Sequence, residues 1–198
     1  MRLRNSLSIG SPPPKLNIGC GAATPEGFHN IDILPAPNID TVMDIDHDPL
    51  PFETGTISAV LASHVVEHIA HVERLFGEVH RVLRVGGIFE IYVPYGNYGR
   101  RTTLGHIRSV WPGMARHLGV IVDRRQQRAL PWRLVLSEVS ERALPLAWHF
   151  KHYLGIEPNI GRKAELHFVL EKESPEAFMK HIEEHADSPL VRRIAKKR

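Results

Sequence analysis

The chain has 198 residues, of which 42% are hydrophobic and 24% are charged, as expected for one soluble globular domain. No apolar run approaches the roughly 18 residues that cross a membrane, the N-terminus lacks the apolar core of a signal peptide, and the net charge of +3 is too small to indicate nucleic acid by itself. The single cysteine, Cys20, cannot form an internal disulfide, which favours a cytoplasmic location.

The first half of the chain alternates apolar runs with turn residues. Strands are expected over KLNIGC, FHNIDIL, TVMDID and ISAVLASH, at residues 15–20, 28–34, 41–46 and 57–64. From Val66 the apolar residues recur every three or four positions, which predicts an amphipathic helix that ends at Gly86–Gly87. GIFEIYVPY then predicts another strand, so that strand, helix and strand form a right-handed parallel crossover.

The second half is less regular. Residues 96–150 predict an insert on the acceptor side, in which LVLSEVSERALPLAWHF is expected to be a helix broken at Pro145. ELHFVLEK predicts a late strand and PEAFMKHIEEHA a surface helix. We expect one domain over residues 1–198, with a disordered lead-in at 1–14 and a basic tail at 187–198.

Charge is distributed unevenly along the chain. Residues 26–90 hold 11 acids against three arginines, whereas residues 100–133 hold eight arginines and one acid. The tail adds five more basic residues, so the acidic front is followed by a basic middle and a basic end.

Two glycines and an acid end the first two expected strands. Gly19 and Gly21 have no Cβ, so a ligand can approach the main chain closely. Asp32 can accept hydrogen bonds from a ribose diol, and the carboxyl ends of parallel strands are where ligands bind. A dinucleotide site places its acid roughly 20 residues on, after a helix, whereas Asp32 comes 11 residues after Gly21. The spacing therefore argues against a nicotinamide-dependent oxidoreductase.

Five segments, taken in order, resemble the class I S-adenosylmethionine-dependent methyltransferases of the small type 11-like group. They are LNIGCG, NIDI, MDIDHDPLPF, VLASHVVEHI and VLRVGGIFEIYVP, over residues 15–95. The resemblance implies an α/β, Rossmann-like fold with a seven-strand mixed sheet and a late antiparallel hairpin. It also implies S-adenosylmethionine as cofactor and methyl transfer as the reaction. Some members of this group replace the first crossover helix with a short loop, as GCGAATPEGFHNID suggests here.

The resemblance further implies which residues meet the cofactor. Asp32 is expected at the ribose hydroxyls, Asp44 at the adenine amino group with the Ile45 backbone at the ring edge, and Ser63 and His64 beside the transferable methyl. The full set expected at the cofactor is Asn17, Gly19, Cys20, Gly21, Asp32, Ile33, Asp44, Ile45, Ser63 and His64.

A general base can remove a proton from an oxygen or nitrogen acceptor, and His64, His68 and His106 are the expected catalytic residues, with Glu67 as a further candidate. The segment LGHIRSVWPGMARHL resembles the H-x-R region of members associated with cell-surface glycan biosynthesis, which implies that His106 and Arg108 bind the acceptor. The acceptor is therefore expected to be a small or glycan-like, anionic molecule. An RNA acceptor, favoured by the basic insert and tail, and a degenerate S-adenosylmethionine-binding module are the alternatives.

HVVEH, residues 64–68, matches the H-x-x-E-H pattern of inverted zinc peptidases. The motif begins where a buried strand ends, however, and no downstream acid stands out as a third ligand. Certain similar O-methyltransferases bind a divalent ion through E-x-x-E-H, but His64 replaces the first glutamate here. The sequence thus predicts that no metal is needed.

Overall fold

The computed structural model describes residues 14–94, 105–107, 122–123, 128–130, 132–143 and 162–184. Within these ranges no helix is both long enough and apolar enough to cross a membrane. The elements are β1 (Lys15–Ile18), β2 (Phe28–Asp32), β3 (Thr41–Val42), β4 (Ile57–Ser63), η1 (Val66–His68), α1 (Val72–Val82), β5 (Leu83–Pro94), β6 (Val122–Asp123), β7 (Arg128–Ala129), β8 (Trp132–Ala143), β9 (Arg162–Lys172) and α5 (Pro175–Glu184).

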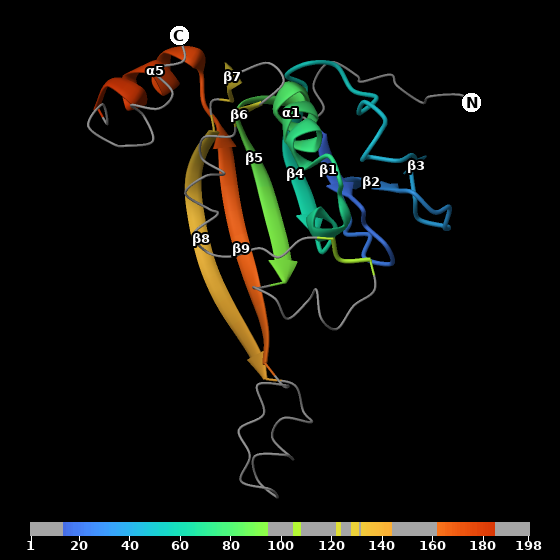
Figure 1. Cartoon of the computed structure of the whole chain (residues 1–198). Coiled ribbons are helices and arrows are strands. Elements are labelled where there is room, and N and C mark those ends of the chain that lie inside the picture. The colour runs from blue at the N-terminus through green and yellow to red at the C-terminus, as the bar shows by residue number, and fades with distance from the viewer. Residues whose placement is uncertain are drawn as a thin grey trace, which may run out of the picture.

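Seven strands form one mixed sheet in the order β3-β2-β1-β4-β5-β9-β8. β1 to β5 run parallel to one another, whereas β9 is antiparallel to both β5 and β8. Figure 1 shows this reversal, with the β9 arrow pointing opposite to those of β5 and β8. The predicted α/β fold, with its mixed seven-strand sheet and late antiparallel hairpin, is confirmed.

The connection between β1 and β2 is unusually short. The two strands are adjacent and parallel, yet only residues 19–27 join them and none of these is helical. A parallel crossover ordinarily needs a dozen residues or more, usually with a helix. The backbone N–H of Cys20 donates to the carbonyl of Ile31 at 3.2 Å, which holds the loop against β2. The predicted shortened crossover is confirmed.

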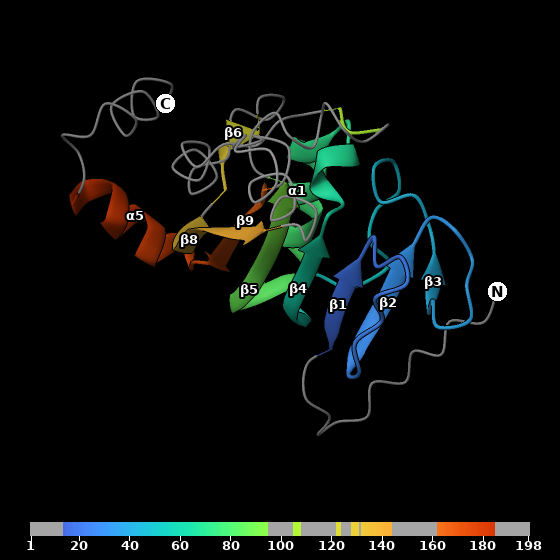
Figure 2. The ribbon, with the colours of Figure 1, turned by 90° about the horizontal axis from the view of Figure 1, so that it is seen from below.

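α1 covers one face of the sheet, as Figures 1 and 2 show. Its apolar side, Leu75, Phe76, Val79 and Val82, is buried, and the ring of Phe76 packs edge-on against Phe89 of β5 at 5.1 Å. Burying each such side chain stabilises the fold by about 1.5–3 kcal/mol. The core therefore lies between α1 and the central strands.

Both ends of the expected helix differ from the prediction. The helix was expected to run without a break from Val66, but the structure has the short turn η1 and then α1. The carboxylate of Asp46 accepts hydrogen bonds from the backbone N–H groups of Ala70 at 3.0 Å and His71 at 2.7 Å, which turns the chain between the two. α1 ends before the predicted glycines, where Lys172 donates to the carbonyls at positions 80 and 83.

The helix predicted for residues 134–150 is wrong over 134–143, which lie in β8. A bulge between Leu134 and Leu136 shifts the register with β9, so the apolar residues lose the two-residue period that marks a strand. Pairing with β9 overrides the local helical preference. The rest of that expected helix, the lead-in up to residue 13 and the tail from 187 lie outside the described residues.

Candidate functional site

The predicted cofactor residues follow neighbouring strands at one edge of the sheet. Ile18, near the end of β1, pairs with Ile31 of β2 and with Ala62 of β4. The next residues along these strands are Gly19, Asp32 and Ser63, so the register brings them to the same carboxyl edge. In open α/β sheets ligands bind at the carboxyl ends of the strands, and Gly19, Asp32 and Ser63 all lie there.

Asp32 is tied to the glycine loop. Its Oδ2 accepts a hydrogen bond from the backbone N–H of Gly21 at 2.8 Å, and its Oδ1 accepts one from Leu34 at 3.0 Å. A carboxylate has about four acceptor positions, so two stay open for the hydroxyls of a ribose. Ile33 follows directly and is 60% exposed, which offers an apolar surface beside these oxygens.

The two glycines are needed for different reasons. Both have a positive φ, 60° at Gly19 and 53° at Gly21. A Cβ on Gly19 would lie 2.2 Å from Cγ2 of Val65, in the segment after β4, whereas a Cβ on Gly21 would meet no described atom within 4 Å. Gly19 therefore lets the loop pack against the end of β4, and Gly21 leaves open space beside Asp32.

Alanine substitutions should separate these two roles. Gly19→Ala adds a clash of about 1–3 kcal/mol to a left-handed backbone strain of about 1–2 kcal/mol, whereas Gly21→Ala adds the strain alone. We expect Gly19→Ala to lower the free energy of unfolding more, measured by urea denaturation. Adding Val65→Ala should restore part of the loss at Gly19 and none at Gly21. Equal losses in both single variants would contradict this assignment.

Asn17 and Cys20 are buried and stabilise the loop between β1 and β2. Asn17 is 2% exposed, and its side-chain amide donates to the carbonyl of Ala23 at 2.7 Å and to Oδ1 of Asn30 at 3.0 Å. Cys20 is buried, and burial is the main cause that raises the pKa of its thiol. Both residues were predicted to meet the cofactor. The structure shows that the hydrogen bonds of Asn17 and the buried side chain of Cys20 hold the loop in shape.

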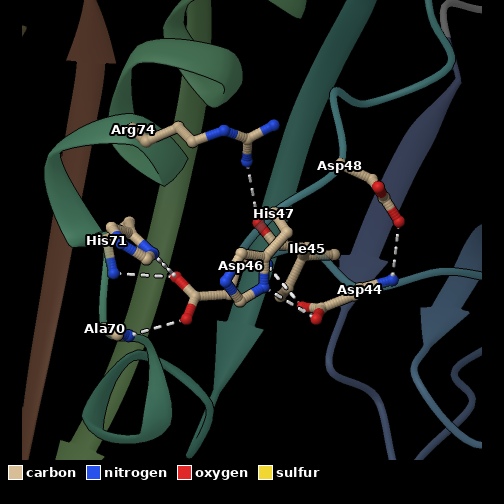
Figure 3. Close-up of polar contacts among 8 residues, drawn as sticks. All are labelled: Asp44, Ile45, Asp46, His47, Asp48, Ala70, His71 and Arg74. Carbon is tan, nitrogen blue, oxygen red and sulfur yellow. Dashed lines mark hydrogen bonds and ion pairs between the residues drawn. The ribbon is translucent and has the colours of Figure 1, made fainter.

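Asp44 lies in a network of short-range contacts after β3 (Figure 3). Its Oδ1 accepts from the backbone N–H of Asp46 at 2.9 Å and its Oδ2 from Nδ1 of His47 at 2.9 Å. The hydrogen bond from His47 is the main cause that lowers the pKa of the Asp44 carboxyl. The backbone N–H of Met43 donates to the carbonyl of Asp32 at 2.9 Å, which places Asp44 close to the predicted ribose site.

His64 directly follows β4 and has a left-handed backbone, with φ at 55°. Its backbone N–H donates to the carbonyl of Tyr92 in β5 at 2.8 Å. Its Nε2 donates to Oε2 of Glu165 at 2.8 Å, and its Nδ1 lies 3.5 Å from Oε1 of Glu67. Glu67 is the main cause that raises the pKa of the imidazole; burial opposes it and Glu165 adds to it. A half-exposed imidazole is thus held between two carboxylates.

His68 and His106 also lie close to Glu67. Their rings meet edge-on at 4.6 Å, and Nε2 of His106 lies 4.0 Å from Oε1 of Glu67. The backbone N–H of Ile107 donates to the carbonyl of Glu67 at 3.0 Å. Burial is the main cause that lowers the pKa of His106. The structure therefore gathers the three predicted catalytic histidines around one glutamate.

Two more residues differ in how far the sequence predicted them. Arg108, expected to bind the acceptor beside His106, lies outside the described residues. Glu165, the partner of His64, was missed by the sequence analysis. It pairs across the sheet with Pro94 at the carboxyl end of β5, so only the register of the late hairpin could have placed it here.

The chain is similar to one known protein family and to several solved structures. The family described as "Methyltransferase domain" matches residues 32–91. The chain is similar to the protein described as a methyltransferase in complex with the Trm112 methyltransferase activator of Haloferax volcanii, at 13% identity over 82% of this chain and 83% of that one, with a TM-score of 0.55. A protein of Bacillus halodurans described as a methyltransferase is 9% identical over 81% and 93%, with a TM-score of 0.56.

A third similar structure contains ligands. It is phosphoethanolamine N-methyltransferase 2 of Haemonchus contortus, in complex with phosphomonomethylethanolamine and S-adenosylhomocysteine, at 12% identity over 83% of this chain and 50% of that one, with a TM-score of 0.51. No curated protein sequence matches the chain. At these identities the structural likeness shows the fold, and the resemblance drawn from the sequence is confirmed.

Proposed function

Because the chain carries a methyltransferase domain with the class I fold, we propose that it transfers methyl groups from S-adenosylmethionine to a small or glycan-like, anionic acceptor. The observation that carries the cofactor is the pairing of Asp32 with the N–H of Gly21 beside open space. That arrangement offers a diol-binding carboxylate and a main chain that a ligand can approach. The exposed Ile33 and the carboxylate of Asp44 support the adenine side.

When bound, S-adenosylmethionine supplies an electrophilic methyl group on a sulfonium, so the protein mainly has to orient the acceptor. Among the three predicted catalytic histidines, His64 is the best placed to take the proton of the acceptor. Its side chain is 48% exposed, whereas that of His106 is 8% exposed. His68 is exposed too, but it lies in η1, whereas His64 directly follows β4, where the transferable methyl is expected. Glu165 orients His64 from β9 and acts as a positioning residue.

Two observations support an anionic acceptor: the positive charge of residues 100–133, and the hydrogen bonds that hold residues 105–107 beside Glu67 and His68. Residues 100–133 hold eight arginines, and arginine binds carboxylate or phosphate bidentately. Among the described parts of this stretch, residues 105–107 are hydrogen-bonded to Glu67 and His68 next to the carboxyl end of β4. We therefore assign the part of the basic segment around residues 105–107 to the acceptor side, with His106 and Arg108 as acceptor-binding residues; Arg133 pairs instead with Glu171, which lies opposite Ile88 in the first half of β5.

The full chain should bind S-adenosylmethionine and S-adenosylhomocysteine, and should not bind NAD. The short loop offers one carboxylate for a ribose and lacks the helix N-terminus on which a dinucleotide pyrophosphate sits. Isothermal titration calorimetry with the three ligands checks this. Binding of NAD with no heat from S-adenosylhomocysteine would overturn the proposal.

The basic insert and tail also fit an RNA acceptor, and salt separates the two cases. Many phosphate contacts would make binding fall by about 0.7–0.9 log units per contact for each tenfold rise in salt. A small anionic acceptor gives a shallow slope, because few charges are neutralised. We expect the shallow slope in a titration of turnover against potassium chloride.

A further inference from the structure

We propose that Glu67, His68 and His106 bind one divalent transition-metal ion at the carboxyl end of β4. Each residue offers one ligand atom, and these atoms all lie within 4.8 Å of one another. Glu67 and His68 belong to η1, whereas His106 comes from the segment after β5. The proposal departs from the prediction from the sequence that no metal is needed.

The carboxylate of Glu67 points to a bound cation. The side chain is 1% exposed, and neither oxygen accepts a hydrogen bond from any residue that the structure describes. The basic atoms near it are Nδ1 of His64 at 3.5 Å and Nε2 of His106 at 4.0 Å. A buried carboxylate without hydrogen bonds is costly, and metal coordination is one of the few ways to offset that cost.

An outer hydrogen bond orients His68 as in many metal sites, whereas Nδ1 of His106 is buried with no partner among the described residues. Nδ1 of His68 lies 3.1 Å from the carbonyl of Gly105. Because a carbonyl only accepts, the proton is on Nδ1, which leaves the lone pair of Nε2 for a metal. Such an outer hydrogen bond is typical of metal-binding histidines. The bond from Ile107 to the carbonyl of Glu67 fixes the two ligand-bearing segments to each other.

The ligand types select the ion. Two imidazoles and one carboxylate suit Zn²⁺, Co²⁺ or Fe²⁺, whereas Mg²⁺ and Ca²⁺ favour oxygen ligands alone. Ligands of a tetrahedral ion lie about 3.3 Å apart at bond lengths near 2.0 Å, so ligand atoms that now lie within 4.8 Å of one another have to approach by up to about 1.5 Å. Three protein ligands leave a position open. Resting on the proposed function, that position takes an oxygen of the acceptor and favours its deprotonated form.

A second cluster serves as a matched comparison. Asp46, His47 and His71 also place ligand atoms within 4.8 Å of one another. Both oxygens of Asp46, however, accept backbone hydrogen bonds from Ala70 and His71, as Figure 3 shows. This carboxylate is already satisfied, so the cluster ties the loop after β3 to the start of α1 and should not hold a metal.

Titration of the full, tag-free chain with Co²⁺, followed by visible absorption, tests the site. We expect one ion per chain. Loss of a residue that only hydrogen-bonds to a metal ligand typically weakens metal binding by about 10–100-fold. Glu67→Gln and His106→Ala remove a ligand itself, so each should weaken Co²⁺ binding by at least that much. His71→Ala should stay within about twofold of the wild type. An equal loss in His71→Ala, or no stoichiometric binding at millimolar Co²⁺, would overturn the proposal.

Thermal unfolding gives a second readout that does not depend on activity. Zn²⁺ should raise the Tm of the wild type and a chelator should reverse the rise, because the ion binds the folded state. Glu67→Gln, which keeps the shape of the side chain, should not respond; a response equal to that of the wild type counts against the site. Calorimetry with S-adenosylhomocysteine on the same samples separates the metal site from the proposed methyltransferase function. If the chain binds this ligand but no Co²⁺, only the proposal of a metal site is wrong.

Discussion

Replacing Asp32 by alanine is expected to weaken S-adenosylmethionine binding by about 100-fold or more. Two hydrogen bonds from ribose hydroxyls to a charged acceptor contribute about 1.5–3 kcal/mol each, and about 1.4 kcal/mol corresponds to a tenfold change in affinity. The same carboxylate also holds the N–H of Gly21, so the loop loses its tie to β2. Both effects act in the same direction. Calorimetry on the purified variant measures the sum.

Asp40 offers the control for this experiment. Its Oδ2 accepts a hydrogen bond from the backbone N–H of Asn30 at 2.8 Å, so Asp40→Ala also removes a carboxylate that binds the main chain nearby. Asp40 is not among the predicted cofactor residues. The affinity of the Asp40→Ala variant for S-adenosylmethionine should therefore stay within about twofold of the wild type. Unchanged binding in Asp32→Ala would mean that the ribose site lies elsewhere.

The front half of the fold was predictable because its signals are local. Each of the four expected strands contains a strand of the structure, and the apolar positions from Leu75 to Val82 form the buried side of α1. Gly19, Asp32 and Ser63 also come to one edge of the sheet as expected, because the carboxyl ends of parallel strands share that edge. Knowing the strands and their direction is enough to bring Gly19 next to Asp32.

The errors arise where distant segments decide local structure. Nothing near Val66 in the sequence shows that the carboxylate of Asp46 will take the N–H groups of Ala70 and His71 and interrupt the helix. In β8, the bulge at Leu134 removes the alternation that would have marked a strand. In both places a tertiary contact outweighs the local preference.

The site shows the same division. HVVEH drew attention to His64, Glu67 and His68, because the residue types and their spacing are visible in the chain. That Glu67 is buried with no hydrogen bond from the described residues, and that it lies 4.0 Å from His106, depends on where residues 105–107 pack. Glu165 reaches His64 only through the antiparallel register of β9. The sequence therefore predicted the candidate residues of the site, but it did not predict which residues from distant segments contact them.

His64→Asn is expected to lower kcat by about 100-fold or more while the affinity for S-adenosylhomocysteine changes little, because positioned general bases contribute about 10²–10⁴-fold. Asparagine is the appropriate replacement. It tolerates a positive φ better than most residues, so the backbone at 55° should keep its hydrogen bond to Tyr92. The variant therefore removes the imidazole without adding strain after β4. Turnover with saturating cofactor, together with calorimetry, separates the two effects.

Glu165→Gln and His71→Asn complete the series. Glutamine at 165 removes the charge that orients Nε2 of His64, so kcat should fall less than in His64→Asn with KM nearly unchanged. His71 is an exposed histidine that pairs with Asp46, and His71→Asn should leave turnover within about twofold of the wild type. If His64→Asn turned over at the wild-type rate on the true acceptor, the base would not be His64. A kcat lost equally in all three variants would instead indicate a general effect on folding, which the free energies of unfolding measured on the same samples would reveal.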